Sequence, residues 1–141
     1  GSYVLEPIGP TKLDGNEISG ATVLGNSHLI ELGDSVRIRF ARPHELSATA
    51  RLTKEIGHRT APSADAILLM AESCVLGSGA HSHVRCRDWE QDVILFRQNH
   101  EIMCRSAGAL SVDGQPSEGA APLANGTRIE GQDFSMCVEL V

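Results

Sequence analysis

The sequence predicts an all-β protein, a sandwich of short antiparallel strands, on three observations. Apolar and polar residues alternate with a period of two along much of the chain, whereas helical periodicity is scarce. Glycine, asparagine, aspartate and proline separate these stretches at short, roughly even intervals, as turns between strands require. Hydrophobic residues make up 41% of the chain, and because only 4% are aromatic, aliphatic side chains must fill most of the core.

The first half of the chain contains a predicted β-hairpin. The residues that alternate with polar neighbours and so share one face of its first strand are Val36, Ile38 and Phe40. Residues 42–45 form the bend, and residues 46–52 form the returning strand. Residues 48–56 are also rich in helix-forming residue types. A strand is nevertheless predicted here, because residues 134–140, which resemble residues 46–52 in sequence, have the alternating pattern of a strand.

A polar stretch at residues 53–64 is the best candidate for a linker, and a second series of strands follows it. Residues 66–70 form a continuous apolar run, which is typical of a strand buried on both faces. After the next strand, the Gly-Ser-Gly sequence at residues 77–79 predicts a tight turn. The remaining strands are predicted at residues 83–86, 92–97, 101–104, 109–112, 128–129 and 134–140.

The end of the chain repeats its beginning. The Val-Asp-Gly sequence at residues 112–114 matches Leu-Asp-Gly at residues 13–15, and two further segments follow in the same order. The further matches are residues 33–36 with 126–129 and residues 46–52 with 134–140. The repeat predicts two related β modules: residues 3–52 form the second half of one, residues 53–64 a linker, and residues 65–141 a full module.

The formal net charge is −6, and all of it lies in the second half of the chain. Residues 1–62 contain seven Lys or Arg and seven Asp or Glu, whereas residues 63–141 contain five and eleven. An acidic module repels the phosphate backbone of nucleic acids, so no nucleic-acid partner is expected. No apolar run reaches membrane-spanning length, so no membrane partner is expected either. The expected location is the cytoplasm.

The four cysteines are Cys74, Cys86, Cys104 and Cys137. Each lies in an apolar stretch and none forms a CxxC pair, which predicts buried and reduced thiols. His81, His83 and Cys86 suggest a zinc site, but on one strand Cys86 would point away from the two histidines. A nucleophilic thiol would have to be exposed, whereas the alternation turns Cys86 inward. We therefore expect no metal, no cofactor and no catalytic activity.

The order of parts in the second module resembles that of a forkhead-associated (FHA) domain, a family of two-sheet β-sandwiches. Residues 74–77 occupy the place of the family's first glycine-arginine turn. Residues 106–114 are similar to the family signature serine-x-asparagine-glycine-threonine-x-valine-asparagine-glycine. The residues in common are Ser106, Val112 and Gly114. Residues 13–15 and 32–36 resemble the second half of another FHA unit.

The resemblance implies a site for phosphothreonine peptides, but its residues are altered in this chain. Members of the family hold the phosphate with an arginine and with hydroxyl and backbone donors, while an asparagine orders the peptide. The candidate peptide- and phosphate-binding residues are Ser78, Arg85, Ser106 and Gly108. Ser78 stands in the place of the arginine, and Gly108 in the place of the asparagine. Residues 88–92 replace the family's serine-x-x-histidine loop and add three carboxylates where the anion would sit.

The expected function is that of a non-catalytic protein–protein interaction module in a signalling or scaffold protein, with a degenerate phosphothreonine-peptide site. The alternative is a purely structural scaffold domain that packs against a neighbouring FHA module. In a third interpretation, an arginine of a neighbouring strand replaces the family's arginine and supplies the positive charge for the phosphate. The candidates are Arg85, Arg87 and Arg105. The expected partner is a protein or phosphoprotein. Open edges of the incomplete first module also favour a homodimer through the N-terminal half-unit, or packing of that half across the second module.

Overall fold

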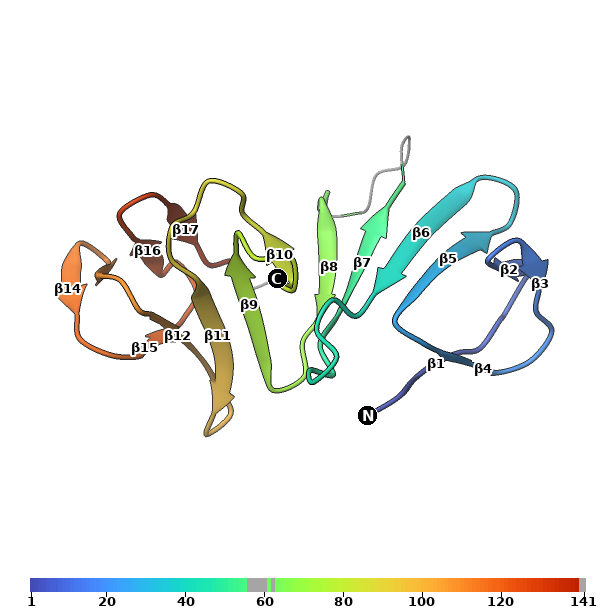
Figure 1. Ribbon diagram of the computed structural model, residues 1–141, viewed down its shortest axis with the longest axis horizontal. Coiled ribbons are helices and arrows are strands. Elements are labelled where there is room, and N and C mark those ends of the chain that lie inside the picture. The colour runs from blue at the N-terminus through green and yellow to red at the C-terminus, as the bar shows by residue number, and fades with distance from the viewer. Residues whose placement is uncertain (56–60, 62, 140–141) are drawn as a thin grey trace. The chain divides into compact units, whose positions relative to one another are not determined.

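The structure is a computed structural model that describes residues 1–55, 61 and 63–139. It confirms the all-β class, because the described residues form 17 strands and no helix. The described part of the chain therefore holds no helix long and apolar enough to cross a membrane. The chain divides into two compact units, Gly1–Ala71 and Glu72–Val141, which we name unit 1 and unit 2. Figure 1 labels most strands of both units.

Unit 1 consists of a six-stranded antiparallel sheet and a two-stranded one (Figure 1). The larger sheet has the order β3-β2-β5-β6-β7-β8, with the bounds Asn16–Glu17 (β3), Thr11–Leu13 (β2), Ser27–Leu32 (β5), Val36–Ala41 (β6), Ala50–Lys54 (β7) and Ala66–Leu69 (β8). The smaller sheet pairs β1 (Tyr3–Leu5) with β4 (Thr22–Leu24). The predicted hairpin is present as β6 and β7, but its returning strand is Ala50–Lys54 rather than residues 46–52, and the connection before it is longer than the predicted bend at residues 42–45. Residues 50–54 form a strand and not a helix.

One apolar cluster joins the two sheets of unit 1. Its buried members are Leu13, Leu24, Ile30, Phe40 and Ala50. The ring of Tyr3, on β1, packs edge-on against Phe40 with 5.3 Å between ring centroids. Its hydroxyl lies 2.6 Å from the backbone oxygen of Ala48 and 3.0 Å from that of Leu69. Each fully buried large apolar side chain contributes about 1.5–3 kcal/mol to folding, so this cluster is the main source of stability in unit 1.

Unit 2 also consists of two sheets. The five-stranded sheet has the order β10-β9-β11-β12-β15, with the bounds Val84–Arg85 (β10), Ser73–Gly77 (β9), Val93–Gln98 (β11), Glu101–Ser106 (β12) and Ala121–Leu123 (β15). The four-stranded sheet has the order β14-β13-β16-β17, with the bounds Gln115–Ser117 (β14), Leu110–Val112 (β13), Arg128–Glu130 (β16) and Ser135–Cys137 (β17). The buried core residues, drawn from both sheets, are Val93, Cys104, Leu110 and Ile129. Trp89 packs against this core and stacks on Phe134 at 4.3 Å.

The repeat seen in the sequence is present in the strand pairing of the two units. A shift of 99 positions, the separation of Asp14 and Asp113, carries β1 and β4 onto β12 and β15. The same shift carries the β2–β3 hairpin onto β13–β14, and β5 onto β16. Paired residues correspond one to one, as in Tyr3↔Leu24 and Ile102↔Leu123. Together with β6 and β17, which correspond at a shift one smaller, these strands give both units the same six-strand frame. The frame is extended by β7 and β8 in unit 1 and by β9 to β11 in unit 2.

After β5 the shift is 98, because paired residues of β16 and β17 lie one position closer in the sequence than those of β5 and β6. Ile30 pairs with Ile38 in unit 1, and Ile129 pairs with Met136 in unit 2. Two of the expected segment matches are therefore wrong. Residues 33–36 connect β5 to β6 whereas residues 126–129 lead into β16, and residues 134–138 correspond to β6 rather than to residues 46–52. Glycine occurs both in the turn before β6 and in the turn before β16, so a shared glycine does not show that two turns occupy the same place in the frame.

The Asp-Gly turn of the β2–β3 hairpin recurs in the β13–β14 hairpin. Asp14 and Asp113 both have φ 50°, and the glycines that follow have φ 84° and 80°, which is the geometry of a type I′ turn. Asp14 Oδ1 accepts the N–H of Leu29 at 2.8 Å. Asp113 Oδ1 accepts the N–H of Arg128 at 2.9 Å. Each aspartate fastens its hairpin to the adjacent strand, which explains why these residues recur in the sequence.

A second turn is capped in both units, with different chemistry. His28 Nδ1 lies 2.6 Å from Asp14 Oδ2, and its Nε2 accepts the N–H of Gly25 at 2.8 Å. Thr127 takes the same position in unit 2, where its Oγ1 accepts the N–H of Ala124 at 3.0 Å. The backbone N–H that Asp14 accepts, together with the histidine beside it, lowers the pKa of this carboxyl below its usual value.

The boundary between the units differs from the predicted linker. β8, expected to open the second module, instead pairs with β7, and the division falls after Ala71. Thr53 and Lys54 belong to β7, while residues 56–60 and 62 of the predicted linker lie outside the described residues. β8 is also an edge strand rather than a strand buried on both faces, and Ile67 is 45% exposed. An apolar run indicates a tendency to be buried, but it carries no information about which sheet accepts the strand.

Truncating the core of one unit should unfold that unit alone. Phe40→Ala should destabilise unit 1 by about 3–5 kcal/mol, because it empties a fully packed site, and Ile129→Ala should destabilise unit 2 by about 2–5 kcal/mol. Residue-resolved hydrogen exchange of each variant measures both units at once. Equal loss of protection in both units from either variant would show that they share one cooperative core.

The contribution of the Asp14 carboxylate to the stability of unit 1 should disappear in acid. Because its pKa is lowered on folding from 3.8, the stabilisation is fully present above about pH 4 and is lost as the pH falls through the folded-state value. Urea unfolding of unit 1 should therefore show a larger difference between wild type and Asp14→Asn at pH 7 than at pH 3. Asp34→Asn, at an exposed position in the β5–β6 turn, controls for the loss of one charge. An unchanged difference at the two pH values would contradict the assignment.

Candidate functional site

Three segments of unit 2 meet at the candidate site: the end of β9, the residues before β11, and the residues after β12. Ser106 joins two of them, because its hydroxyl donates to the backbone oxygen of Asp92 at 3.0 Å. The hydroxyl oxygen of Ser106 also accepts the N–H of Gly108 at 3.2 Å. The hydroxyl that the FHA resemblance assigns to a ligand is therefore already used inside the protein.

The carboxylate of Asp92 covers the end of β9. A side chain at Gly77 would collide with the Asp92 side chain where it now lies, so glycine at this position leaves room for the carboxylate. Arg85 pairs with Gly77 in register on the neighbouring strand β10. Its side chain therefore leaves the sheet on the face where the Asp92 carboxylate lies. Any anion at this point meets a carboxylate beside the arginine.

A small cavity next to Ser106 is lined by acidic residues. It measures about 20 Å³, which is room for roughly one water molecule. The lining residues are Glu90, Gln91, Ser106, Gly108, Ala109, Gln132, Asp133 and Phe134. Asp133 Oδ2 accepts the backbone N–H of Glu90 at 2.6 Å and so closes one wall. A phosphate group does not fit into this cavity, and two carboxylates border it.

Two of the four predicted site residues are brought together and two lie outside this contact. Ser106 and Gly108 share a hydrogen bond, and Gln91 lies over Gly108, 3.1 Å from where a side chain would begin. Ser78 is exposed directly after β9, and Arg85 is exposed on β10. Asp133 was not anticipated, because it comes from the turn before β17 and no sequence pattern links that turn to residues 88–92.

One of the alternative arginines is engaged elsewhere. The guanidinium of Arg105, on β12, lies 5.4 Å from the ring centroid of Phe96 on the neighbouring strand β11. Arg87 is exposed in the segment between β10 and β11. The interpretation that a neighbouring arginine replaces the family's arginine therefore rests on Arg85 and Arg87.

The cysteines differ in burial. Cys74 and Cys104 are fully buried, and this burial raises the pKa of both thiols to about 11. Burial also raises the pKa of Cys86, so the two flanking arginines do not make it a thiolate. Cys137 is exposed, which corrects the expectation that all four thiols are buried. His83 is buried, with its Nδ1 accepting the N–H of Val75 at 3.0 Å.

No metal-binding cluster of three or more His, Cys, Asp or Glu side chains occurs among the described residues. The histidine that would have joined His81 in a zinc site is the buried His83, whose Nδ1 is used by the backbone. The geometry of this segment is therefore that of a core histidine.

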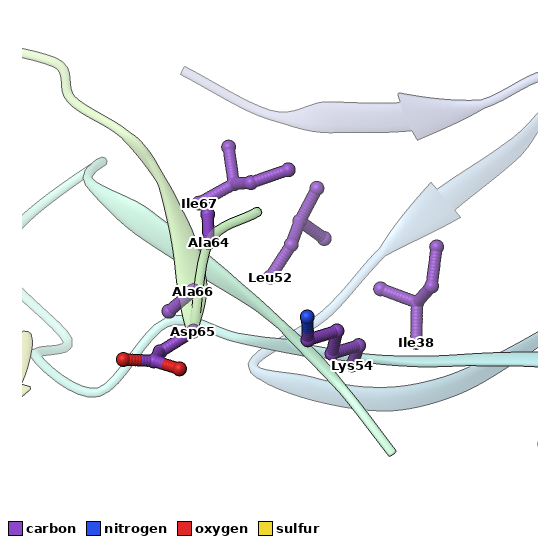
Figure 2. A pocket seen from close by; sticks show the side chains of 7 residues that line it. All are labelled: Ile38, Leu52, Lys54, Ala64, Asp65, Ala66 and Ile67. Carbon is purple, nitrogen blue, oxygen red and sulfur yellow. The ribbon is translucent and has the colours of Figure 1, made fainter. Parts of the chain in front are cut away.

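An apolar hollow of about 50 Å³ lies on unit 1 (Figure 2). Its apolar side chains come from three neighbouring strands: Ile38 from β6, Leu52 from β7 and Ile67 from β8. Figure 2 shows these three side chains on one side of the sheet, while Asp65 points away from them.

Comparison with protein-family models, with curated proteins and with solved structures finds no match to this chain in any of the three.

The four thiols should react in the order of their burial. At pH 8 Cys74 and Cys104, with pKa values of about 11, are thiolate in only about one molecule in a thousand, and the core also excludes reagent. Timed alkylation with N-ethylmaleimide, followed by mass spectrometry, should label Cys137 first and these two last. Repeating the reaction in urea should remove the difference. Equal labelling of Cys74 and Cys137 in the native protein would contradict the burial described above.

Proposed function

We propose that unit 2 is a non-catalytic protein–protein interaction module of the FHA type, part of a signalling or scaffold protein, whose phosphothreonine-peptide site is degenerate. The observation that carries the proposal is the use of Ser106 to join two loops of the candidate site. The convergence of the segments around Gly77, Asp92 and Ser106 supports the FHA relationship, because these segments hold the positions that the resemblance assigns to the ligand.

The charges around the site oppose phosphate binding. A phosphothreonine carries about −1.5 to −2 charges, and two unit charges 4 Å apart in water interact by about 1 kcal/mol. Each nearby carboxylate therefore costs roughly 1–2 kcal/mol, and Asp92, Glu90 and Asp133 all border the site. A peptide without phosphate escapes this cost. The proposed partner is accordingly a protein recognised without its phosphate, and the free thiols support a reducing compartment such as the cytoplasm.

The alternative is a structural scaffold domain. It is favoured by the internal hydrogen bonds of Ser106, since a residue that holds loops together needs no ligand. Under this alternative no peptide contacts the loops at all, whereas an interaction module binds a peptide independently of phosphate.

An NMR titration distinguishes these outcomes. The ¹⁵N-labelled protein is titrated with a pool of phosphothreonine peptides and with the same pool without phosphate. We expect the same amide shifts from both pools, because a carboxylate lies on the same side of the sheet as Arg85 and the hydroxyl of Ser106 is already hydrogen-bonded. A separate phosphopeptide-binding domain, titrated with the same pools, verifies that the phosphorylated pool is competent.

Phosphate-dependent shifts that cluster at Ser78, Arg85, Ser106 and Gly108 would contradict the degenerate site. The absence of shifts from either pool would favour the scaffold alternative. Ser106→Ala provides a structural check: it should destabilise unit 2 by about 1 kcal/mol through loss of the loop hydrogen bonds, without changing any peptide response.

A further inference from the structure

The strand β8 is the longest edge strand among the described sheets, and it lacks the usual protection of an edge. Its residues, Ala66–Leu69, include no charge and no proline, and among the described strands it pairs only with β7. Natural edge strands are kept from pairing with other chains by shortness, charge or proline. The opposite edge of the same sheet, β3, has only two residues, one of them Glu17. In unit 2 the edge strands β14 and β15 contain Pro116 and Pro122.

The backbone groups that β8 leaves open follow from the pairing of its neighbour β7. Glu55, directly after β7, donates its N–H to β6, so by alternation the backbone groups of Leu52 face β8. Leu52 pairs with Ile67, and these two residues therefore form a hydrogen-bonded pair. The N–H and C=O groups of Ala66 and Leu68 consequently point away from β7, into the open edge.

A second, antiparallel copy of β8 satisfies these groups by symmetry. With a two-fold axis at Ile67, Ala66 of each copy lies opposite Leu68 of the other and exchanges two hydrogen bonds with it. The two Ile67 residues then form the closer, non-hydrogen-bonded pair at the axis. A small side chain lies opposite a larger one on both sides of the axis, and no like charges meet within the strand.

The side chain of Ile67 ends an apolar row that begins in the core of unit 1. Phe40, which is 1% exposed, pairs with Leu52, and Leu52 pairs with Ile67, which is 45% exposed. Directly paired residues of neighbouring strands lie on the same face of a sheet. Figure 2 shows Leu52 and Ile67 on one side of the sheet with Ile38. Ile67 of a second copy would extend this row and cover the part of Ile67 that is now exposed.

We propose that β8 is a self-pairing edge, through which two copies of this chain join the large sheets of unit 1 antiparallel about Ile67. The occupant is a second copy because the edge matches itself in hydrogen-bond phase, in side-chain size and in charge. The homodimer expected from the sequence used residues 3–52, whereas this one uses residues 66–69. Two such short strands bury less than the roughly 1,600 Å² of a standard interface, so the dimer is weak and depends on concentration.

Disulfide trapping tests the register. In Ile67→Cys/Cys137→Ser, the two side chains at position 67 lie opposite each other with Cα atoms about 4.5 Å apart, within the range of a disulfide. The second substitution removes the exposed native thiol. We expect mild oxidation to give a covalent dimer that peptide mapping shows to be joined at position 67 of both chains.

Ala66→Cys/Cys137→Ser is the matched control for the crosslink. Position 66 lies opposite position 68 of the second copy, and its side chain projects from the other face of the sheet, so little covalent dimer should form. Absence of the crosslink at position 67 overturns the proposal. Equal yields from the two variants overturn it as well, because they would show contact without the proposed register.

Sedimentation of the chain without any new cysteine gives an independent measurement. We expect the sedimentation coefficient to rise between about 10 μM and 1 mM protein, the range of weak association. Ile67→Lys places two like charges opposite each other at the axis and should weaken dimerisation by about tenfold or more. Leu46→Lys is the control, because Leu46 is 94% exposed and lies outside the strands.

A strict monomer over this range of concentration overturns the proposal and leaves an extended segment of another protein as the partner to test at β8. Association that Ile67→Lys does not weaken also overturns it, because the dimer would then use another surface.

Discussion

The pairing of β7 with β6 is the interaction on which the rest of the arrangement depends. It decides that the β7–β8 hairpin belongs to unit 1, and therefore that the units divide after Ala71. It also places β8 at the edge of the large sheet and leaves Ile67 partly exposed. A strand edge is a row of unpaired donors and acceptors, so the strand that pairs with β6 also decides which edge of the large sheet of unit 1 stays open.

The repeated frame shows which parts of the sequence are structural. Asp14 and Asp113 make the same backbone hydrogen bond in the two units. At the next position the chemistry differs, with His28 in one unit and Thr127 in the other, yet both cap the preceding turn. What the frame requires is an acceptor at that point, and either side chain supplies one. The frame is therefore distinct from the loops of unit 2 that form the candidate site.

At the candidate site, the side chains that could contact a ligand are used to hold the loops of unit 2 together. The Ser106 hydroxyl stabilises the junction of two segments, and the Asp92 carboxylate lies against Gly77. Both arrangements favour a stable loop cluster and oppose the entry of an anion. Both arrangements therefore support the proposal of a partner recognised without phosphate, or of no ligand at all.

The sequence by itself determined the all-β class, the β6–β7 hairpin and the Asp-Gly repeat, because alternation and turn chemistry act over a few residues. It also identified the carboxylates of residues 88–92 near the candidate site. Only the tertiary structure decided that β8 joins unit 1, that the later repeat segments match differently, that Asp133 borders the site and that Cys137 is exposed. These features depend on pairing between distant segments, and an apolar run or a turn glycine specifies burial or curvature but not the partner.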